Sequence, residues 1–172
     1  LEAGLFFRLD ASNVIDRNIA SVVMPIGEDH KDFLKKGTID EIVFEKCSSL
    51  LNNSKIIISE QKKDIMNKIK KNISQNSSLK FIFGKNYTYK KNKNGFIYKD
   101  QKGKINLPFP NLLGDFQISN VSTAISVVRN INKFDITESH IQKAVTKIKS
   151  EGRLQFIKKG KLRKYVAKNN TI

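Results

Sequence analysis

The first half of the chain alternates between short apolar runs and one segment with helical periodicity. Residues 19–24 and 55–59 are apolar runs of the length that is typical of buried strands in a parallel sheet. Between them, Thr38 followed by Glu41 forms a capping-box pattern, which predicts a helix that begins at Ile39. A strand, a helix and a second strand in this order indicate a βαβ unit of a doubly wound sheet. Such sheets bind ligands beyond the carboxyl ends of their strands.

The predicted helix carries a lysine inside its apolar stripe. When residues are placed at about 100° per position, Lys46 falls between the directions of Ile42 and Ile39. Lysine is rarely buried without a partner. Either the stem carries the ammonium out to solvent, or the amine has a chemical role. The pattern alone leaves both interpretations open. The apolar positions of the stripe are Ile39, Ile42, Val43, Cys47, Leu50 and Leu51.

Four β-rich segments follow in the second half of the chain. They are short and are separated by turn residues, of which Asn94-Gly95 is a favourable hairpin turn. We therefore expect them to pair as one small antiparallel meander. The segments are residues 79–83, 86–90, 96–99 and 105–109.

Three further helices complete the pattern. An amphipathic helix is predicted at residues 64–74, one begins at Gly114 or Asp115, and the last begins at Thr137. Together the elements predict an α/β fold. Its main part is a portion of a doubly wound, mostly parallel sheet, to which the small antiparallel meander is attached.

The charge of the chain is strongly positive. The 172 residues include 32 Lys and Arg against 16 Asp and Glu, which gives a formal net charge of +16. Such an excess is compatible with nucleic acid or with an anionic substrate. The lysines are spread along the chain together with many asparagines and isoleucines, and only residues 90–93 and 158–168 are dense in them. We therefore do not expect a nucleic-acid partner, although a basic nucleic-acid-binding module is kept as an alternative hypothesis.

Other features of the composition favour a cytoplasmic protein. No apolar run approaches the roughly 20 residues of a membrane span, so no membrane partner is expected. Cys47 is the single cysteine and cannot form an internal disulfide, which suits a reducing compartment. We expect a monomer.

Five short motifs occur in a fixed order along the chain. The sequence opens with LEAGLFFRLDASN, continues with IGEDH and FEK, and later contains LPFPNLLGDFQISN and SEGRLQFI. These motifs resemble the EVGLGGRLDATN, SIGxDH, FEKAGI, LPLPGLLGxHQxxNAA and PGRLQ patterns of the folylpolyglutamate synthase/dihydrofolate synthase family, which is related to the Mur ligases. The resemblance covers most of the chain and corresponds to the central part of the family pattern.

The resemblance implies an ATP-dependent ligase that adds glutamate to folate or to dihydropteroate. In this family the carboxylic acid attacks the γ-phosphate of ATP, and the amine of glutamate then displaces phosphate from the acyl phosphate. The cofactors implied are ATP and Mg²⁺ or Mn²⁺. By the same resemblance, residues 1–150 would be the C-terminal portion of a Mur-ligase-like ATP- and metal-binding domain. Residues 151–172 would be a linker and the start of a truncated C-terminal domain.

The resemblance also implies the roles of five residues. Lys46 matches a lysine that the family carries as a carbamate, which bridges metal ions and takes part in catalysis. Glu2 and His30 match metal ligands. Asn120 and Arg153 match positions that contact ATP, the first at the base and the second at the phosphates.

The chain departs from the family pattern in ways that support a second alternative. Phe6 and Phe7 stand where the family has two glycines, and no G-x-x-x-x-G-K-[ST] phosphate loop occurs in the sequence. Phenylalanine suits neither positive φ nor close backbone approach, so this loop must be built differently. We therefore expect the chain to be inactive by itself, and a non-catalytic, degenerate remnant of the enzyme is the alternative.

Overall fold

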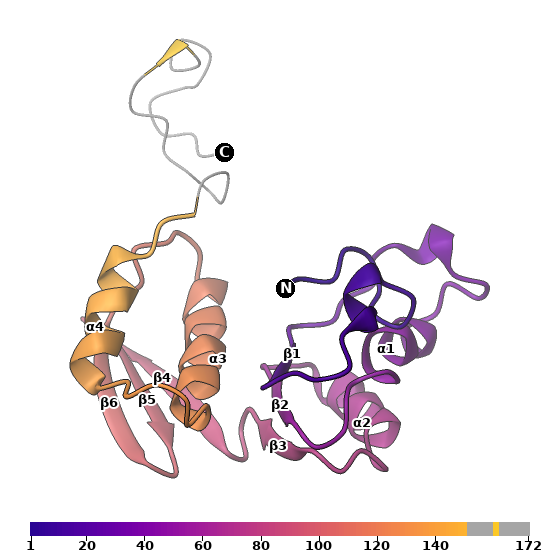
Figure 1. Cartoon of the computed structure of the whole chain (residues 1–172). Helices are drawn as coiled ribbons and strands as arrows, with labels where there is room; N and C mark the ends of the chain where they lie inside the picture. The colour runs from indigo at the N-terminus through magenta and orange to yellow at the C-terminus, as the bar shows by residue number, and fades with distance from the viewer. Residues whose placement is uncertain (151–159, 162–172) are drawn as a thin grey trace.

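Two three-stranded sheets form the framework of the computed structural model, which describes residues 1–150 and 160–161 (Figure 1). The first sheet is parallel, with the order β1-β2-β3. The second is antiparallel, with the order β4-β5-β6. This combination confirms the predicted α/β class. The strands are β1 (Ser21–Val23), β2 (Lys55–Ile58), β3 (Leu79–Ile82), β4 (Tyr87–Asn92), β5 (Gly95–Asp100) and β6 (Gly103–Pro108).

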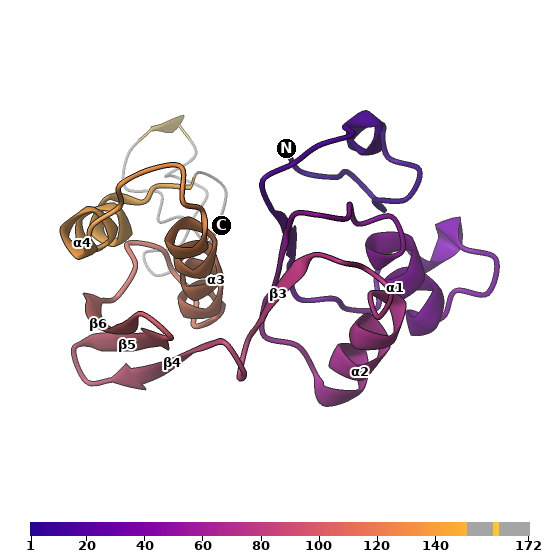
Figure 2. The same ribbon diagram turned by 60° about the horizontal axis from the view of Figure 1, so that its bottom comes forward.

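In residues 1–150, four α-helices and two short 3-10 helices accompany the sheets. In Figures 1 and 2, α1 and α2 lie together beside the parallel sheet, whereas α3 and α4 lie over the antiparallel sheet. In the described part of the chain, no helix combines the length and apolar character that crossing a membrane requires. The helices are η1 (Ala11–Val14), η2 (Lys31–Phe33), α1 (Ile39–Cys47), α2 (Lys63–Asn72), α3 (Phe116–Asn130) and α4 (Glu138–Lys147).

The central strand β2 supplies side chains to two separate hydrophobic cores. Ile56 and Ile58 are fully buried in the core that α1 and α2 share with the parallel sheet. Ile57 points to the opposite face and is fully buried in the core that contains α3, α4 and the antiparallel sheet. Successive strand residues face opposite sides, so β2 joins the two halves of the structure.

The predicted four-stranded meander is wrong in its first member. Residues 79–83 form β3, which pairs parallel with β2 in a register that places Phe81 beside Ile57. Only the three later segments are antiparallel. The chain changes sheet after β3, at Gly84, whose φ of 80° suits glycine (Figure 2). A short apolar segment does not encode the direction of its partner, which explains the error.

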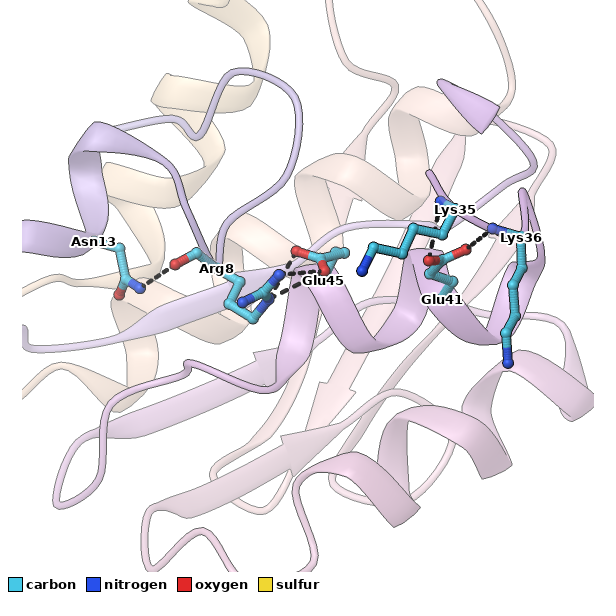
Figure 3. A network of polar contacts seen from close by, with 6 residues as sticks. All are labelled: Arg8, Asn13, Lys35, Lys36, Glu41 and Glu45. Atoms are coloured by element: carbon cyan, nitrogen blue, oxygen red, sulfur yellow. Dashed lines mark hydrogen bonds and ion pairs between the residues drawn. The ribbon is translucent and has the colours of Figure 1, made fainter. Parts of the chain in front are cut away.

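The helix starts follow the predicted capping patterns with one difference. At α1, Thr38 Oγ1 accepts a hydrogen bond from the Glu41 backbone N–H at 3.3 Å. The Glu41 carboxylate does not return this bond. It accepts instead from the backbone N–H groups of Lys35 and Lys36, at 3.2 and 2.8 Å (Figure 3). Glu41 therefore fixes the loop before α1.

Buried polar contacts tie the second core together. The Tyr87 hydroxyl donates to the Ile58 carbonyl oxygen of β2 at 3.0 Å and lies 3.2 Å from Thr123 Oγ1 of α3. Burial raises the pKa of Tyr87 to about 12. The guanidinium of Arg129 on α3 donates to both carboxylate oxygens of Asp100 on β5, and the two side chains are 10% and 6% exposed.

Candidate functional site

The motifs RLDASN and FEK, which lie far apart in the sequence, contact each other directly. Arg8 Nε lies 3.0 Å from each oxygen of the Glu45 carboxylate, and Arg8 Nη2 donates to Oε1 at 2.8 Å (Figure 3). The Arg8 backbone N–H also donates to the Glu45 carbonyl oxygen at 2.9 Å. The guanidinium lies over the Phe44 ring, 5.6 Å from its centroid. The first loop is therefore docked on α1 by side-chain and main-chain contacts.

Asp10 organises the loop internally. Its carboxylate accepts hydrogen bonds from the Ser12 side chain, from the Ser12 backbone N–H at 2.8 Å, and from the Gly4 backbone N–H at 2.9 Å. These bonds favour the ionised form and lower the pKa of Asp10, with the Ser12 hydroxyl as the main cause. Asn13 closes the motif by donating to the Arg8 carbonyl oxygen at 2.9 Å (Figure 3).

The docked first loop also contacts the side chain of Lys46. Lys46 lies in the last turn of α1 and is half-buried. Its Nζ donates to the Leu5 carbonyl oxygen at 3.0 Å and lies 5.5 Å from the centroid of the Phe6 ring. The first loop thus supplies both partners of this lysine: a carbonyl oxygen and the face of an aromatic ring.

His30 meets the same aromatic ring from another direction. It lies just before η2 with a left-handed backbone conformation, φ 56°. Its ring packs edge-to-face against Phe6 and Phe33, with centroids 6.3 and 6.4 Å apart. The Nε2 atom lies 3.5 Å from Asp29 Oδ2, and the His30 backbone N–H donates to Asp29 Oδ1 at 2.8 Å. Lys46 and His30 are therefore both neighbours of Phe6.

Glu2, His30 and Lys46 are the residues expected to hold a metal ion. Glu2 is exposed. Among residues 1–150 and 160–161, no three His, Cys, Asp or Glu side chains group in a way that could hold a metal. An ammonium cannot ligate a cation, and the ring of Phe6 contacts both Lys46 and His30. The Phe6 ring is thus a shared neighbour of Lys46 and His30, and the three-residue metal site stays a prediction.

Of the two residues expected to contact ATP, Asn120 is not part of this group. Asn120 lies on α3, half-buried, and its Nδ2 donates to Gln117 Oε1 at 3.2 Å within the same helix. Arg153 lies outside the described residues. Asp115, the residue before α3, forms an exposed ion pair at 2.6 Å with Lys91 on β4.

Sequence reasoning did not single out Arg8 or Glu45. Each lies in a quoted motif, and the two residues carry opposite charges, which is the signal that could have paired them. It did identify Phe6 and Phe7 as a departure that requires a different loop. In the structure both phenylalanines pack against the core around α1 and α2.

Comparisons with curated proteins place the chain beside folate enzymes. No protein-family model matches it. The dihydrofolate synthase/folylpolyglutamate synthase of Haemophilus influenzae is 30% identical over 168 residues, which cover 95% of this chain and 36% of that protein. A probable dihydrofolate synthetase of Schizosaccharomyces pombe is 27% identical over 158 residues, which cover 91% of this chain and 37% of that protein. The chain therefore spans little more than a third of the length of these relatives.

Solved structures give the same result for the fold. The E. coli FolC in complex with DHPP and ADP matches with a TM-score of 0.76 and 25% identity, over 90% of this chain and 36% of that chain. The apo form of L. casei FPGS matches with a TM-score of 0.80 and 22% identity, over 90% of this chain and 39% of that chain. The chain is thus related in sequence and in fold to part of the dihydrofolate synthase/folylpolyglutamate synthase family, as its five motifs predict.

Proposed function

We propose that this chain is part of an ATP-dependent ligase that adds glutamate to folate or to dihydropteroate through an acyl phosphate. The observation that carries the proposal is the docking of RLDASN on FEK through Arg8 and Glu45. This contact unites two motifs of the family at the residue that precedes Lys46. The relatives bear the names of enzymes with this activity.

The proposal assigns the five candidate residues to two ends of one site. Glu2, His30 and Lys46 would form its metal end, and Asn120 and Arg153 would contact ATP. Support comes from the fold, which brings Lys46 and His30 together around one side chain, that of Phe6. A Yersinia pestis relative of similar fold is described as complexed with AMPPNP and Mn ion, which agrees with ATP and Mg²⁺ or Mn²⁺ as cofactors. A divalent ion, when bound, would neutralise charge on the phosphates.

The proposed assembly is a monomer in the cytoplasm. Residues 1–150 would belong to the ATP- and metal-binding domain, and residues 151–172 would be a linker leading into a second domain. The small-molecule partners would be ATP, glutamate and folate or dihydropteroate. The E. coli protein of similar fold is described as binding DHPP and ADP, which supports this set.

The test is a chimera in which this chain replaces the matching segment of the Haemophilus influenzae relative. We expect the purified chimera, or its Phe6→Gly version, to hydrolyse ATP only when glutamate and a folate or dihydropteroate are both present. A Lys46→Ala chimera is the control and should lose this activity. If both the parent and the Phe6→Gly chimeras unfold cooperatively on heating yet show no glutamate-dependent turnover, the proposed function is wrong.

A further inference from the structure

Phe6 occupies the position at which the family pattern has glycine, and its ring contacts Lys46 and His30, two of the residues that the proposed function assigns to a metal. We propose that Phe6 is an aromatic plug whose ring covers the side chain of Lys46 and keeps CO2 and a divalent cation away from it. This inference rests on the proposed function, because it concerns the residue that would be carbamylated in the active enzyme.

The position of Phe6 is fixed on three sides. Its ring packs against the core around α1 and α2, lies 5.5 Å from Lys46 Nζ, and packs edge-to-face on His30. The carbonyl oxygen of the preceding residue, Leu5, accepts a hydrogen bond from the same Nζ at 3.0 Å. A glycine at this position would leave the carbonyl in place and remove the ring. The ring is therefore the element specific to this chain.

The electrostatics of the ring favour the cation. The face of an aromatic ring carries partial negative charge and attracts an ammonium. In carbamylation, the lone pair of the neutral Lys46 amine attacks the carbon of CO2. A new N–C bond forms, one C–O π bond becomes a carboxylate, and a proton leaves the nitrogen for solvent. The product keeps one N–H and could still donate to the Leu5 carbonyl oxygen, but its carboxylate would face the negative surface of the Phe6 ring.

The ring also keeps Lys46 and His30 from a common ion. Direct ligands of Mg²⁺ lie about 2.0–2.1 Å from the metal, whereas both side chains here are in contact with the Phe6 ring. A cation shared by the two would have to displace this ring.

The experiment compares the parent chain with Phe6→Gly and uses Phe7→Gly as the matched control. Phe7 is also an aromatic of this loop packed against the same core. Lys46 carbamate is detected by ¹³C NMR in ¹³C-bicarbonate with Mg²⁺, and binding of Mn²⁺ alone is measured by electron paramagnetic resonance. We expect Phe6→Gly to show a carbamate signal and Mn²⁺ binding at least about tenfold tighter than the parent chain or Phe7→Gly. Both gains should vanish in Phe6→Gly with Lys46→Ala.

Two results would overturn the plug. One is a Lys46-dependent carbamate in the parent chain that equals the signal of Phe6→Gly. The other is a folded Phe6→Gly chain with neither a carbamate nor tighter Mn²⁺ binding. If Phe6→Gly does not fold, Phe6→Leu removes the aromatic face while keeping an apolar side chain, and the same two comparisons apply to it. The first of these results would favour the proposed function, which is itself decided by glutamate-dependent turnover of the chimera.

Discussion

The guanidinium of Arg8 donates hydrogen bonds to both carboxylate oxygens of Glu45, which lies 37 positions further along the sequence. The contact sets the geometry of the residues on either side of it. Glu45 is followed by Lys46, and Arg8 is preceded by the loop whose Leu5 carbonyl accepts from Lys46 Nζ. The charged residues of the two motifs are thus used to position the candidate site.

Breaking this pair should loosen the first loop. We expect Glu45→Gln to speed hydrogen exchange of the Gly4 and Arg8 amides at least severalfold, because the loop would lose its paired charge on α1. Asp40→Asn is the control. Asp40 lies on the same helix as Glu45 but forms an exposed ion pair with Lys68 of α2, so its loss should leave these amides unchanged. Equal exchange rates in the two variants would show that the pair does not hold the loop.

The ion pair between Arg129 and Asp100 should be worth much more to stability. Both side chains are largely buried, at 10% and 6% exposure, so Arg129→Ala would leave an unpaired carboxylate inside the second core. We expect a loss of about 3 kcal/mol in the free energy of unfolding, measured with urea. Lys91→Ala breaks the exposed pair with Asp115 and should change stability by no more than about 0.5 kcal/mol. Similar losses in both variants would contradict the argument.

Stability should fall in alkaline solution. Burial raises the pKa of Cys47 from 9.0 to about 12 and that of Tyr87 from 10.0 to about 12. Above pH 9 the unfolded chain therefore loses these protons before the folded chain does, and rising pH favours unfolding. The stabilisation is fully present below pH 9 and is lost by about pH 12, by about 1 kcal/mol or more per pH unit in the steep part.

Tyr87→Phe provides the check on this pH dependence. The variant should lose about 1 kcal/mol at neutral pH, because the hydroxyl no longer donates to the Ile58 carbonyl oxygen. Its stability should then fall less steeply between pH 10 and 12 than that of the parent, as followed by urea unfolding at each pH. Parallel pH profiles would mean that Tyr87 does not contribute to the alkaline transition.

Residues 1–172 by themselves should not ligate glutamate to a folate. The sequence contains no G-x-x-x-x-G-K-[ST] phosphate loop and spans 36% of the Haemophilus influenzae relative. The measurement is folate-dependent release of phosphate from ATP. A rate typical of enzymes, about 1 s⁻¹ or more, would contradict this expectation.

Lys46 should be essential in the chimera through its carbamate and not through its charge. In the Phe6→Gly chimera, Lys46→Ala should abolish turnover, and acetate or another short-chain carboxylic acid should restore part of it by supplying the missing carboxylate. Lys46→Arg should stay inactive, because a guanidinium keeps its charge and cannot form the carbamate. Near-normal turnover of Lys46→Arg would instead assign Lys46 the role of a simple cation.

Local sequence signals predicted most of the elements. Thr38 starts α1 and Thr137 starts α4 as expected, since a capping residue acts on the next turn of its own helix. The direction of β3 was missed because parallel pairing with β2 depends on the path of the whole chain. The partner of the Glu41 side chain was missed for a related reason. Neither the family pattern before Lys46 nor the capping rule takes account of the loop at Lys35 and Lys36, whose backbone N–H groups donate to the Glu41 carboxylate.

Sequence reasoning named residues of the candidate site, but it did not predict which side chains these residues contact. Lys46 was identified from its place in an apolar stripe, and His30 from its place after β1. The contact of Phe6 with Lys46 and with His30 could not be derived from the sequence. A phenylalanine in place of glycine shows only that the loop must accommodate a ring. Where the ring goes depends on the core beneath it.

The alternation of β2 determines where this protein tolerates changes in length. Ile56 and Ile58 face one core and Ile57 the other, so one inserted residue within the strand would exchange the side chains of two cores at once. The exposed stretch at residues 14–17 belongs to neither core and can lengthen without this penalty. Insertions and deletions that accumulate over evolution should therefore cluster in such loops, while the length of β2 stays constant even as its apolar residues are exchanged.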